Sequence, residues 1–223
     1  MTARILALDT TSEFGSLALM AGDEVIEEIL LHSPEGFAHI LFEHVRRLLL
    51  RHRWELGQID CFAAAAGPGA FTGVRVCLAA AKGLAEAIGR KVVAVSNLEA
   101  VASFGSAPLR AAVLDARRGE IYGAVYGSNL EIIRPPTVAK FLNWVQELPE
   151  GDLEFVFADL APFRAALAAT RWASAPVREA PRALAAAIAR IAAARLQAGQ
   201  AQDPAAVEAC YVRRSDAELF WKE

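Results

Sequence analysis

Asp9, Thr10 and Thr11 follow the first apolar run of the sequence and carry oxygen atoms suited to a phosphate or a divalent cation. A carboxylate at a strand end can orient magnesium, and hydroxyl and turn N–H groups can contact phosphate oxygens. Aspartate and threonine are also frequent turn residues, because their side chains hydrogen-bond to nearby backbone. The segment is therefore a candidate nucleotide-contacting turn, with a plain structural turn as the alternative.

The glycine-rich segment 67–73 (GPGAFTG) is the second candidate. It follows an apolar run at 59–66, typical of a strand covered on both faces, and it precedes a predicted helix over 72–88 that Thr72 would cap. A strand, a glycine turn and a helix N-terminus together favour an anion. The glycines would equally permit a tight turn with close helix packing. The site residues in this segment are Gly67, Gly69 and Thr72.

Neither common nucleotide-binding motif is present here. A Walker A loop has Lys and Ser/Thr directly after its last glycine, whereas Lys82 comes later and is followed by Gly83. The last step between Gly67, Gly69 and Gly73 is one residue too long for the dinucleotide fingerprint, and the predicted strand 91–95 ends without an acidic residue.

Histidines and cysteines do not form a metal-binding pattern. His39 and His44 lie about 140° apart around a helix, so they do not share a face as a zinc pair must. His32 and His52 have no neighbours at ligand spacing, which favours surface roles for all four histidines. The three cysteines are odd in number and far apart, and core packing is the expected role of the two at 61 and 77.

Composition points to a chain without a strong field for nucleic acid or membranes. The 223 residues carry a net charge of −3, with a sequence pI near 5.9. No basic and apolar leader is present, and no apolar run reaches the ~18 residues of a membrane span. We expect a soluble, cytoplasmic protein. The basic pairs Arg117-Arg118 and Arg213-Arg214 are read as solubilising charge, with an anion or RNA contact as the alternative.

These segments require a sheet with helices packed on it. Strands are predicted at 4–9, 15–21, 24–31, 59–66 and 91–95, the first three as an antiparallel meander. Helices are predicted from Ser33 to about Arg53, over 72–88 and over 97–103.

The second half of the chain repeats the first at an offset of 106 residues. Asp115 falls on Asp9, Ala124 on Ala18 and Val125 on Leu19. Pro135-Pro136 then leads to predicted helices over 138–148, 161–169 and from Pro181 to near Gly199, with a strand at 153–158. Two βββαβα halves facing each other form the α/β, actin-like (ASKHA, ribonuclease H-like) architecture with a cleft, and a chance match between two hairpins is the alternative.

The second half lacks part of a nucleotide clamp. Its first turn reads ARRG where the first half has TTSE, and no glycine pair follows the predicted strand 153–158. The helix over 72–88, by contrast, is apolar around most of its circumference, so it should be covered on two sides.

Motifs along the whole chain resemble the bacterial TsaB (YeaZ) family: ILALDTTSEFGSLAL, GPGAFTGVR, AAAKGLA, VSNLEAVA, LDARRGEIY and YVRRSDAE. The resemblance implies an actin-like relative of the TsaD enzyme that is not itself the catalyst. It implies pairing with TsaD and TsaE in the complex that makes N6-threonylcarbamoyladenosine at position 37 of ANN-decoding tRNAs, with tRNA contacted only through the complex. No cofactor is expected here, since ATP and metal belong to TsaD and TsaE. TsaD carries a His-x-x-x-His metal pair, and the matching positions here are Asn97 and Val101.

The resemblance assigns TsaD pairing to helices of an N-terminal lobe at 1–104. A C-terminal lobe would span 105–223, and its last segment is a candidate to pack back on the first lobe. Without TsaD the same surface would allow a homodimer. The expected interface residues are Phe37, Ile40, Leu41, His44, Arg75, Ala79, Lys82 and Gly83.

A second hypothesis is an enzyme. The chain would then be an actin-fold ATPase or small-molecule kinase using Asp9, Thr10 and the 67–72 turn, or a metal-dependent peptidase. ATP turnover by the isolated chain separates this hypothesis from a scaffold.

Overall fold

The computed structural model describes residues 2–212 and divides them into two compact units. Unit 1 comprises 2–97 and 182–210, and unit 2 comprises 98–181 with 211–212. The division falls at 97/98, whereas the sequence predicted it at 104/105. Unit 1 is therefore built from both ends of the described chain.

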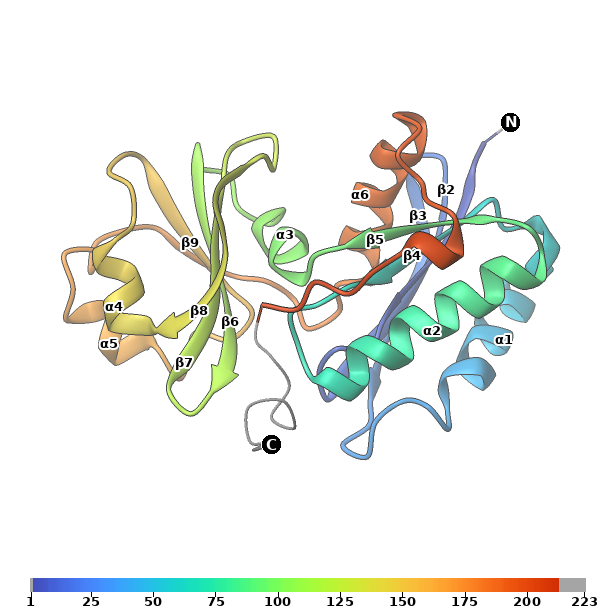
Figure 1. Cartoon of the computed structure of the whole chain (residues 1–223), viewed down its shortest axis with the longest axis horizontal. Coiled ribbons are helices and arrows are strands. Elements are labelled where there is room, and N and C mark those ends of the chain that lie inside the picture. Colours follow the sequence, from blue (N-terminus) through green and yellow to red (C-terminus); the bar gives the residue numbers. More distant parts are fainter. Residues whose placement is uncertain (1, 213–223) are drawn as a thin grey trace, which may run out of the picture. The chain divides into compact units, whose positions relative to one another are not determined.

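Unit 1 is a five-stranded sheet with helices on both faces. Its strands lie in the order β3-β2-β1-β4-β5. Strands β1, β2 and β3 pair antiparallel, while β4 pairs parallel to β1 and β5 parallel to β4. In Figure 1, α6 lies on the opposite side of this sheet from α1 and α2. The elements are β1 (Arg4–Asp9), β2 (Phe14–Ala21), β3 (Glu24–His32), α1 (Leu41–Arg51), η1 (Leu56–Gln58), β4 (Cys61–Ala65), α2 (Phe71–Ala87), β5 (Lys91–Val95), α6 (Ala185–Gln197) and η2 (Pro204–Ala206).

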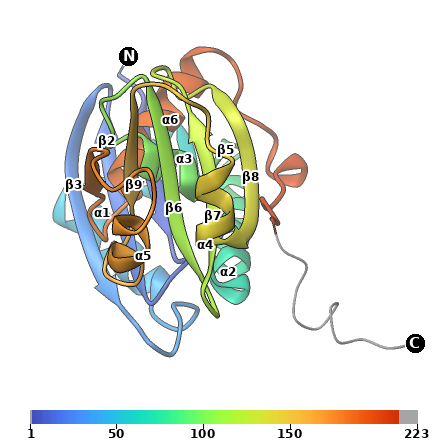
Figure 2. The same ribbon diagram turned by 90° about the vertical axis from the view of Figure 1, so that its left-hand side faces the viewer.

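Unit 2 repeats this topology. Its strand order is β10-β9-β6-β7-β8, and β9, β6, β7 and β8 can be followed side by side in Figure 2. Its elements are α3 (Asn97–Ala102, whose first residue belongs to unit 1), β6 (Leu109–Arg117), β7 (Glu120–Tyr126), β8 (Ile132–Lys140), α4 (Phe141–Gln146), β9 (Leu153–Phe157), α5 (Arg164–Ala168) and β10 (Val177–Glu179). The predicted α/β, duplicated, actin-like fold class is confirmed.

The repeat offset is wrong by one residue in the second hairpin. Ala18 pairs with Ala7 in unit 1, while the partner of Val113, which matches Ala7, is Gly123 rather than Ala124. The register shifts between Asp115 and Arg117, where β6 has one extra residue, Ala116, and this bulge accounts for the difference of one.

Two predicted helix starts are wrong. Ser33 forms a turn with Gly36, whose φ of 88° is left-handed, so α1 begins only at Leu41. Helix α2 begins at Phe71, and its N-cap residue is Ala70, not Thr72.

The helix predicted over 138–148 is present as α4, but its predicted start at Val138 is also wrong, because α4 begins at Phe141. Strand β8 continues to Lys140 and contains both prolines. It is an edge strand with a register shift opposite Gly123 and Val125, and edges and bulges are where a sheet tolerates proline. The short strand β10 was not predicted, since three exposed residues carry no alternation.

Candidate functional site

The carboxylate of Asp9 is buried at the carboxyl end of β1. Its residue is 3% exposed, and its Oδ1 accepts hydrogen bonds from Thr11 N at 2.9 Å and Thr11 Oγ1 at 2.6 Å. Burial raises the pKa of this carboxyl, although hydrogen bonds from Thr11 and Asn97 oppose the rise. The predicted turn at Asp9–Thr11 is therefore a closed, buried turn.

Asn97 joins this turn to the glycine segment. Its Nδ2 donates to Thr11 Oγ1 at 2.7 Å, and its Oδ1 accepts from Gly67 N at 2.9 Å. Its own N–H donates to the Gly67 carbonyl oxygen at 2.8 Å. We call Asp9, Thr11, Gly67 and Asn97 the strand-end network, because they lie where β1, β4 and β5 end.

The two predicted segments also touch through their backbones. The Ala70 N–H donates to the Thr11 carbonyl oxygen at 2.7 Å, and Thr10 Oγ1 donates to the Gly73 carbonyl oxygen at 2.8 Å. A Cβ atom at Gly69 would lie 2.6 Å from the Thr11 oxygen, and one at Gly73 would lie 2.1 Å from the Thr10 oxygen. Only glycine allows this approach, so the glycines serve close packing.

The chemistry open to these groups is limited by their partners. The N–H groups of Gly67 and Ala70 donate to oxygens of the protein itself, so neither is available to a bound phosphate. Thr72 is exposed and takes no part in the network. Five of the predicted site residues do lie close together: Asp9, Thr10, Thr11, Gly67 and Gly69. With Asn97, they connect the segments that follow β1, β4 and β5.

Sequence reasoning missed the role of Asn97. It considered this residue only as a position where a metal-binding histidine was absent. A signal was present, because Asn97 follows strand 91–95, which lies beside β4 in a parallel sheet, so the two carboxyl ends share one edge.

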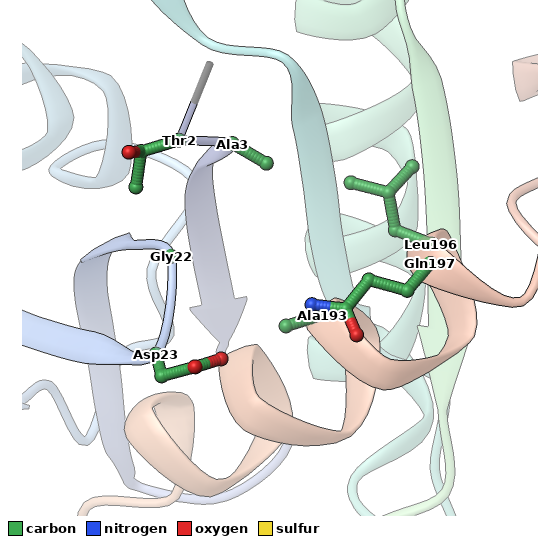
Figure 3. A pocket seen from close by; sticks show the side chains of 7 residues that line it. All are labelled: Thr2, Ala3, Gly22, Asp23, Ala193, Leu196 and Gln197. Atoms are coloured by element: carbon green, nitrogen blue, oxygen red, sulfur yellow. The ribbon is translucent and has the colours of Figure 1, made fainter.

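A shallow pocket lies at the other end of β1. It has a volume of about 260 Å³ and is lined by Thr2, Ala3, Gly22, Asp23, Ala193, Leu196 and Gln197, shown in Figure 3. Strand β1 separates this pocket from Asp9 by six residues, roughly 20 Å of extended chain. The pocket and the strand-end network are therefore distinct places.

The predicted interface residues of the first helix divide into buried and partly exposed ones. Phe37 is 2% exposed and Leu41 is fully buried, so neither side chain faces outward. Ile40 and His44 are half-buried. The phenyl ring of Phe37 covers Gly15, where a Cβ atom would lie 2.7 Å from it.

Two outward apolar side chains of α1 were missed. Phe42 is 56% exposed and Leu50 is 59% exposed, while Leu41, Val45 and Leu48 point inward. The helical period contains this signal, because inward residues at 41, 45 and 48 leave 42 and 50 on the other side. Between the two lies Glu43, paired with Arg46 and Arg47.

On α2, Arg75, Ala79 and Gly83 are exposed as a stripe at helical spacing. The guanidinium of Arg75 stacks 3.7 Å above the Phe71 ring. Lys82 differs from the other three, because it is half-buried and its Nζ donates to the Val207 carbonyl oxygen at 2.9 Å. Lys82 thus tethers the C-terminal segment of unit 1 to α2.

Cysteines and histidines occupy structural positions. Burial raises the pKa of Cys61 to about 12 and raises that of Cys77 further, which disfavours a thiolate nucleophile. His32 stacks on Phe14, and His52 contacts Glu27 at 2.5 Å. Within residues 2–212, no three His, Cys, Asp or Glu side chains are grouped to hold a metal.

Two further sequence observations concern surfaces. Arg117 and Arg118 lie at the exposed tip between β6 and β7, both with left-handed backbone. The Arg213-Arg214 pair lies outside the described residues. Across the described chain, no helix has both the length and the hydropathy of a membrane span.

Comparison with known proteins gives concordant matches. Residues 33–208 match the family model "TsaD: tRNA N6-adenosine threonylcarbamoyltransferase". The chain is 31% identical over 158 residues to the tRNA threonylcarbamoyladenosine biosynthesis protein TsaB of Bacillus subtilis, covering 69% of each. It is 34% identical to the protein of that name from Escherichia coli, covering 55% of this chain and 54% of that one. The chain thus spans about half to two thirds of these relatives' length.

The solved structure of YeaZ from Pseudomonas aeruginosa matches over nearly the whole chain. The TM-score is 0.79 at 27% identity, covering 94% of this chain and 99% of that one. Together with the sequence matches and the duplicated topology, this similarity leads to one conclusion: the chain belongs to the TsaB (YeaZ) family.

Proposed function

We propose that this chain is a non-catalytic, cytoplasmic subunit of the complex that makes N6-threonylcarbamoyladenosine at position 37 of ANN-decoding tRNAs. In this role it binds and stabilises TsaD, and TsaE joins the pair. Its contact with tRNA is indirect, through the complex. Family membership supports the pathway, since the curated relatives are named for threonylcarbamoyladenosine biosynthesis.

The exposed stripe on α2 is the observation that carries the proposal. Ala79 and Gly83 have almost no side chain, so a partner helix can approach the α2 backbone closely. Apart from the backbone of α2 itself, no atom of the described chain lies within 4 Å of a Cβ atom placed at Gly83. Such space on an exposed helix suits an interhelical contact.

Helix α1 offers apolar area for the same partner. Phe42 and Leu50 each expose more than half of their surface, and Arg46 and Arg47 lie on the same helix. A large apolar side chain in water contributes about 1.5–3 kcal/mol when fully buried. These residues replace Phe37 and Leu41 in the proposed interface.

The strand-end network supports a non-catalytic role. In an ATPase or kinase of this fold, the turn at Asp9 and the glycine segment would hold phosphate and metal. In this chain, the Asp9 carboxylate and the Gly67 and Ala70 N–H groups bond within the protein. These groups hold the fold together at the place where an ATPase or kinase of this fold would bind phosphate and metal.

The test is co-purification with TsaD from the same organism. We expect a 1:1 heterodimer by size-exclusion chromatography with light scattering, and we expect Gly83→Phe to abolish it. Gly57→Phe, at another glycine with no atom within 4 Å of its Cβ position, is the matched control and should bind normally. The isolated chain should hydrolyse no ATP, and it forms a homodimer through the same face if it self-associates.

The competing enzyme hypothesis predicts the opposite pattern. ATP or peptide turnover by the isolated chain that disappears in Asp9→Ala, together with no binding to TsaD, would overturn the proposal.

A further inference from the structure

The chain passes from unit 1 to unit 2 twice, and both times the last residue of unit 1 is hydrogen-bonded to Ala66 or Gly67. Asn97 is the last residue of unit 1 before the first crossing, and Cys210 is the last before the second. Asn97 is bonded to Gly67 through both its backbone N–H and its side chain. Cys210 N donates to the Ala66 carbonyl oxygen at 2.7 Å. Ala66 and Gly67 are thus bonded to the last residue of unit 1 at both places where the chain leaves it. We call these places the exits.

The same pair of residues leads into α2. The backbone N–H of Ala66 donates to the Val95 carbonyl oxygen at 2.8 Å, which extends the pairing of β4 with β5. Gly67 has a φ of 93°, so it turns the chain out of the sheet towards the start of the helix. Three residues later, Ala70 is fixed by its bond to Thr11. In Figure 1 this path runs from the end of β4 into the first turn of α2.

Asn97 is the residue that closes this arrangement. It is 2% exposed, and its amide uses both ends, donating to Thr11 and accepting from Gly67. No other side chain of the strand-end network bonds to both turns. Loss of the amide would leave the Gly67 N–H buried without its acceptor. It would also remove the side-chain link between the two turns and leave the Ala70–Thr11 and Thr10–Gly73 bonds to join them.

We propose that Asn97 is a positioning residue that couples the first exit from unit 1 to the start of α2, and so to the exposed stripe that binds the partner. A change in the chain at the exit therefore changes the position of α2. The effect on partner binding rests on the proposed function, whereas the coupling between Asn97 and the start of α2 does not.

Two substitutions separate the links. Asn97→Ala removes the side-chain bonds to Thr11 and Gly67 and the contact with Asp9. Thr11→Val removes the hydroxyl that bonds to Asn97 and Asp9, keeps the side-chain shape and leaves the Asn97–Gly67 bond in place. Ile5→Val and Ile5→Ala, in the buried part of β1 distant from the exits, are controls that bracket the loss of stability.

Hydrogen exchange of the isolated chain is the first readout. We expect Asn97→Ala to raise exchange several-fold at residues 71–75 of α2, with exchange in α6 unchanged. Thr11→Val should give a smaller effect in the same place. An Ile5 variant of equal or lower thermal stability should leave exchange at 71–75 unchanged, because a general loss of stability is not confined to one helix start.

Affinity for TsaD, measured by calorimetry, is the second readout. We expect Asn97→Ala to weaken binding by ~2- to 30-fold, the range for residues that act through coupling, and the Ile5 controls to bind normally. Equal exchange at 71–75 in Asn97→Ala, Thr11→Val and the controls would overturn the inference. If the unmodified chain fails to bind TsaD, the proposed function fails, and the exchange experiment still decides the coupling.

Discussion

The turns after β1 and β6 begin with the same local contact and end in different surroundings. Thr11 N donates to Asp9 Oδ1 at 2.9 Å, and Arg117 N donates to Asp115 Oδ1 at 2.7 Å. Asp9 is buried against the glycine segment and Asn97, whereas Asp115 is exposed. The two units therefore share the aspartate turn, but only the turn of unit 1 is packed against other segments.

The difference lies in the segment after the fourth strand of each sheet. After β4, Gly67, Gly69 and Gly73 allow the helix to lie directly on the Thr10–Thr11 backbone. After β9 the chain has Asp159, Leu160 and Ala161, which form their own turn through the Asp159 carboxylate. The first turn is fixed to the start of α2, whereas the second is an exposed tip, so one topology carries two different environments for the same turn.

The largest loss of stability is expected at Gly73, where the α2 backbone packs directly on the backbone of Thr10. Gly73→Ala puts a Cβ atom 2.1 Å from the Thr10 carbonyl oxygen and should cost about 3 kcal/mol or more, measured by urea unfolding. Gly119→Ala, at the tip between β6 and β7, has a φ of 71° and would bring the Cβ atom no closer than 3.8 Å to Lys140 Nζ, so it should cost about 1 kcal/mol. Equal losses would mean that the first turn is no more tightly packed than the second.

The two aspartates should differ next. Asp9→Ala leaves buried donors of Thr11 without their acceptor and should cost about 1–3 kcal/mol, whereas Asp115→Ala at an exposed turn should cost about 0.5 kcal/mol or less. Chemical denaturation of both variants beside the unmodified chain checks this difference. A larger loss for Asp115→Ala would contradict it.

A third prediction compares the buried carboxyls of the two units by pH. Asp9 has a pKa raised above its ordinary value of 3.8 by burial, so its contribution to stability is present below that value and is lost as pH rises through the raised pKa. Burial alone would raise the pKa of Glu154, but hydrogen bonds from Ser106, Ala107 and Arg178 outweigh it and lower the pKa below 4.5. The Glu154 contribution is therefore present above 4.5 and is lost as pH falls through the lowered pKa.

The measurement is the free energy of unfolding against pH for Asp9→Asn and Glu154→Gln. Relative to the unmodified chain, Asp9→Asn should gain stability as pH rises above 3.8, and Glu154→Gln should lose it as pH rises towards and past 4.5. Differences that run in the same direction in both variants would refute the assigned environments.

The smallest change in stability is expected at the tip between β6 and β7. Arg117 has a φ of 64°, a conformation that asparagine adopts more readily than arginine. Arg117→Asn should therefore stabilise the chain by about 0.5 kcal/mol in thermal unfolding. A loss of stability would indicate that the arginine side chain makes contacts that outweigh the backbone strain.

Sequence reasoning was most successful where a pattern has one physical cause. The strands β1 and β5 have their predicted bounds, and both the duplication and the fold class were predicted, because alternation, apolar runs and turns constrain sheets strongly. It failed where a tertiary contact decides the outcome. Thr72 has the chemistry of a cap, but the Thr11 carbonyl takes the N–H at Ala70 and fixes the helix start.

The candidate site was predicted as a set of residues but not as an arrangement. Asp9 and Gly67 were predicted to be near each other, while the bridging amide of Asn97 depends on the neighbouring ends of β4 and β5. Sequence reasoning did not fix which face of the first helix points outward. Two of its expected interface residues, Phe37 and Leu41, are buried, and Phe37 lies before α1 and follows no helical period.

The strip of chain after α6 has a consequence for biosynthesis. The backbone of Gln202 pairs with Val92 on the edge strand β5, and Cys210 bonds to Ala66. A ribosome makes β5 more than a hundred residues before these partners, and all of 98–181 emerges in between. The β5 edge of the first sheet therefore stays unpaired until the segment after α6 has been made, and the second unit is free to fold before the first is complete.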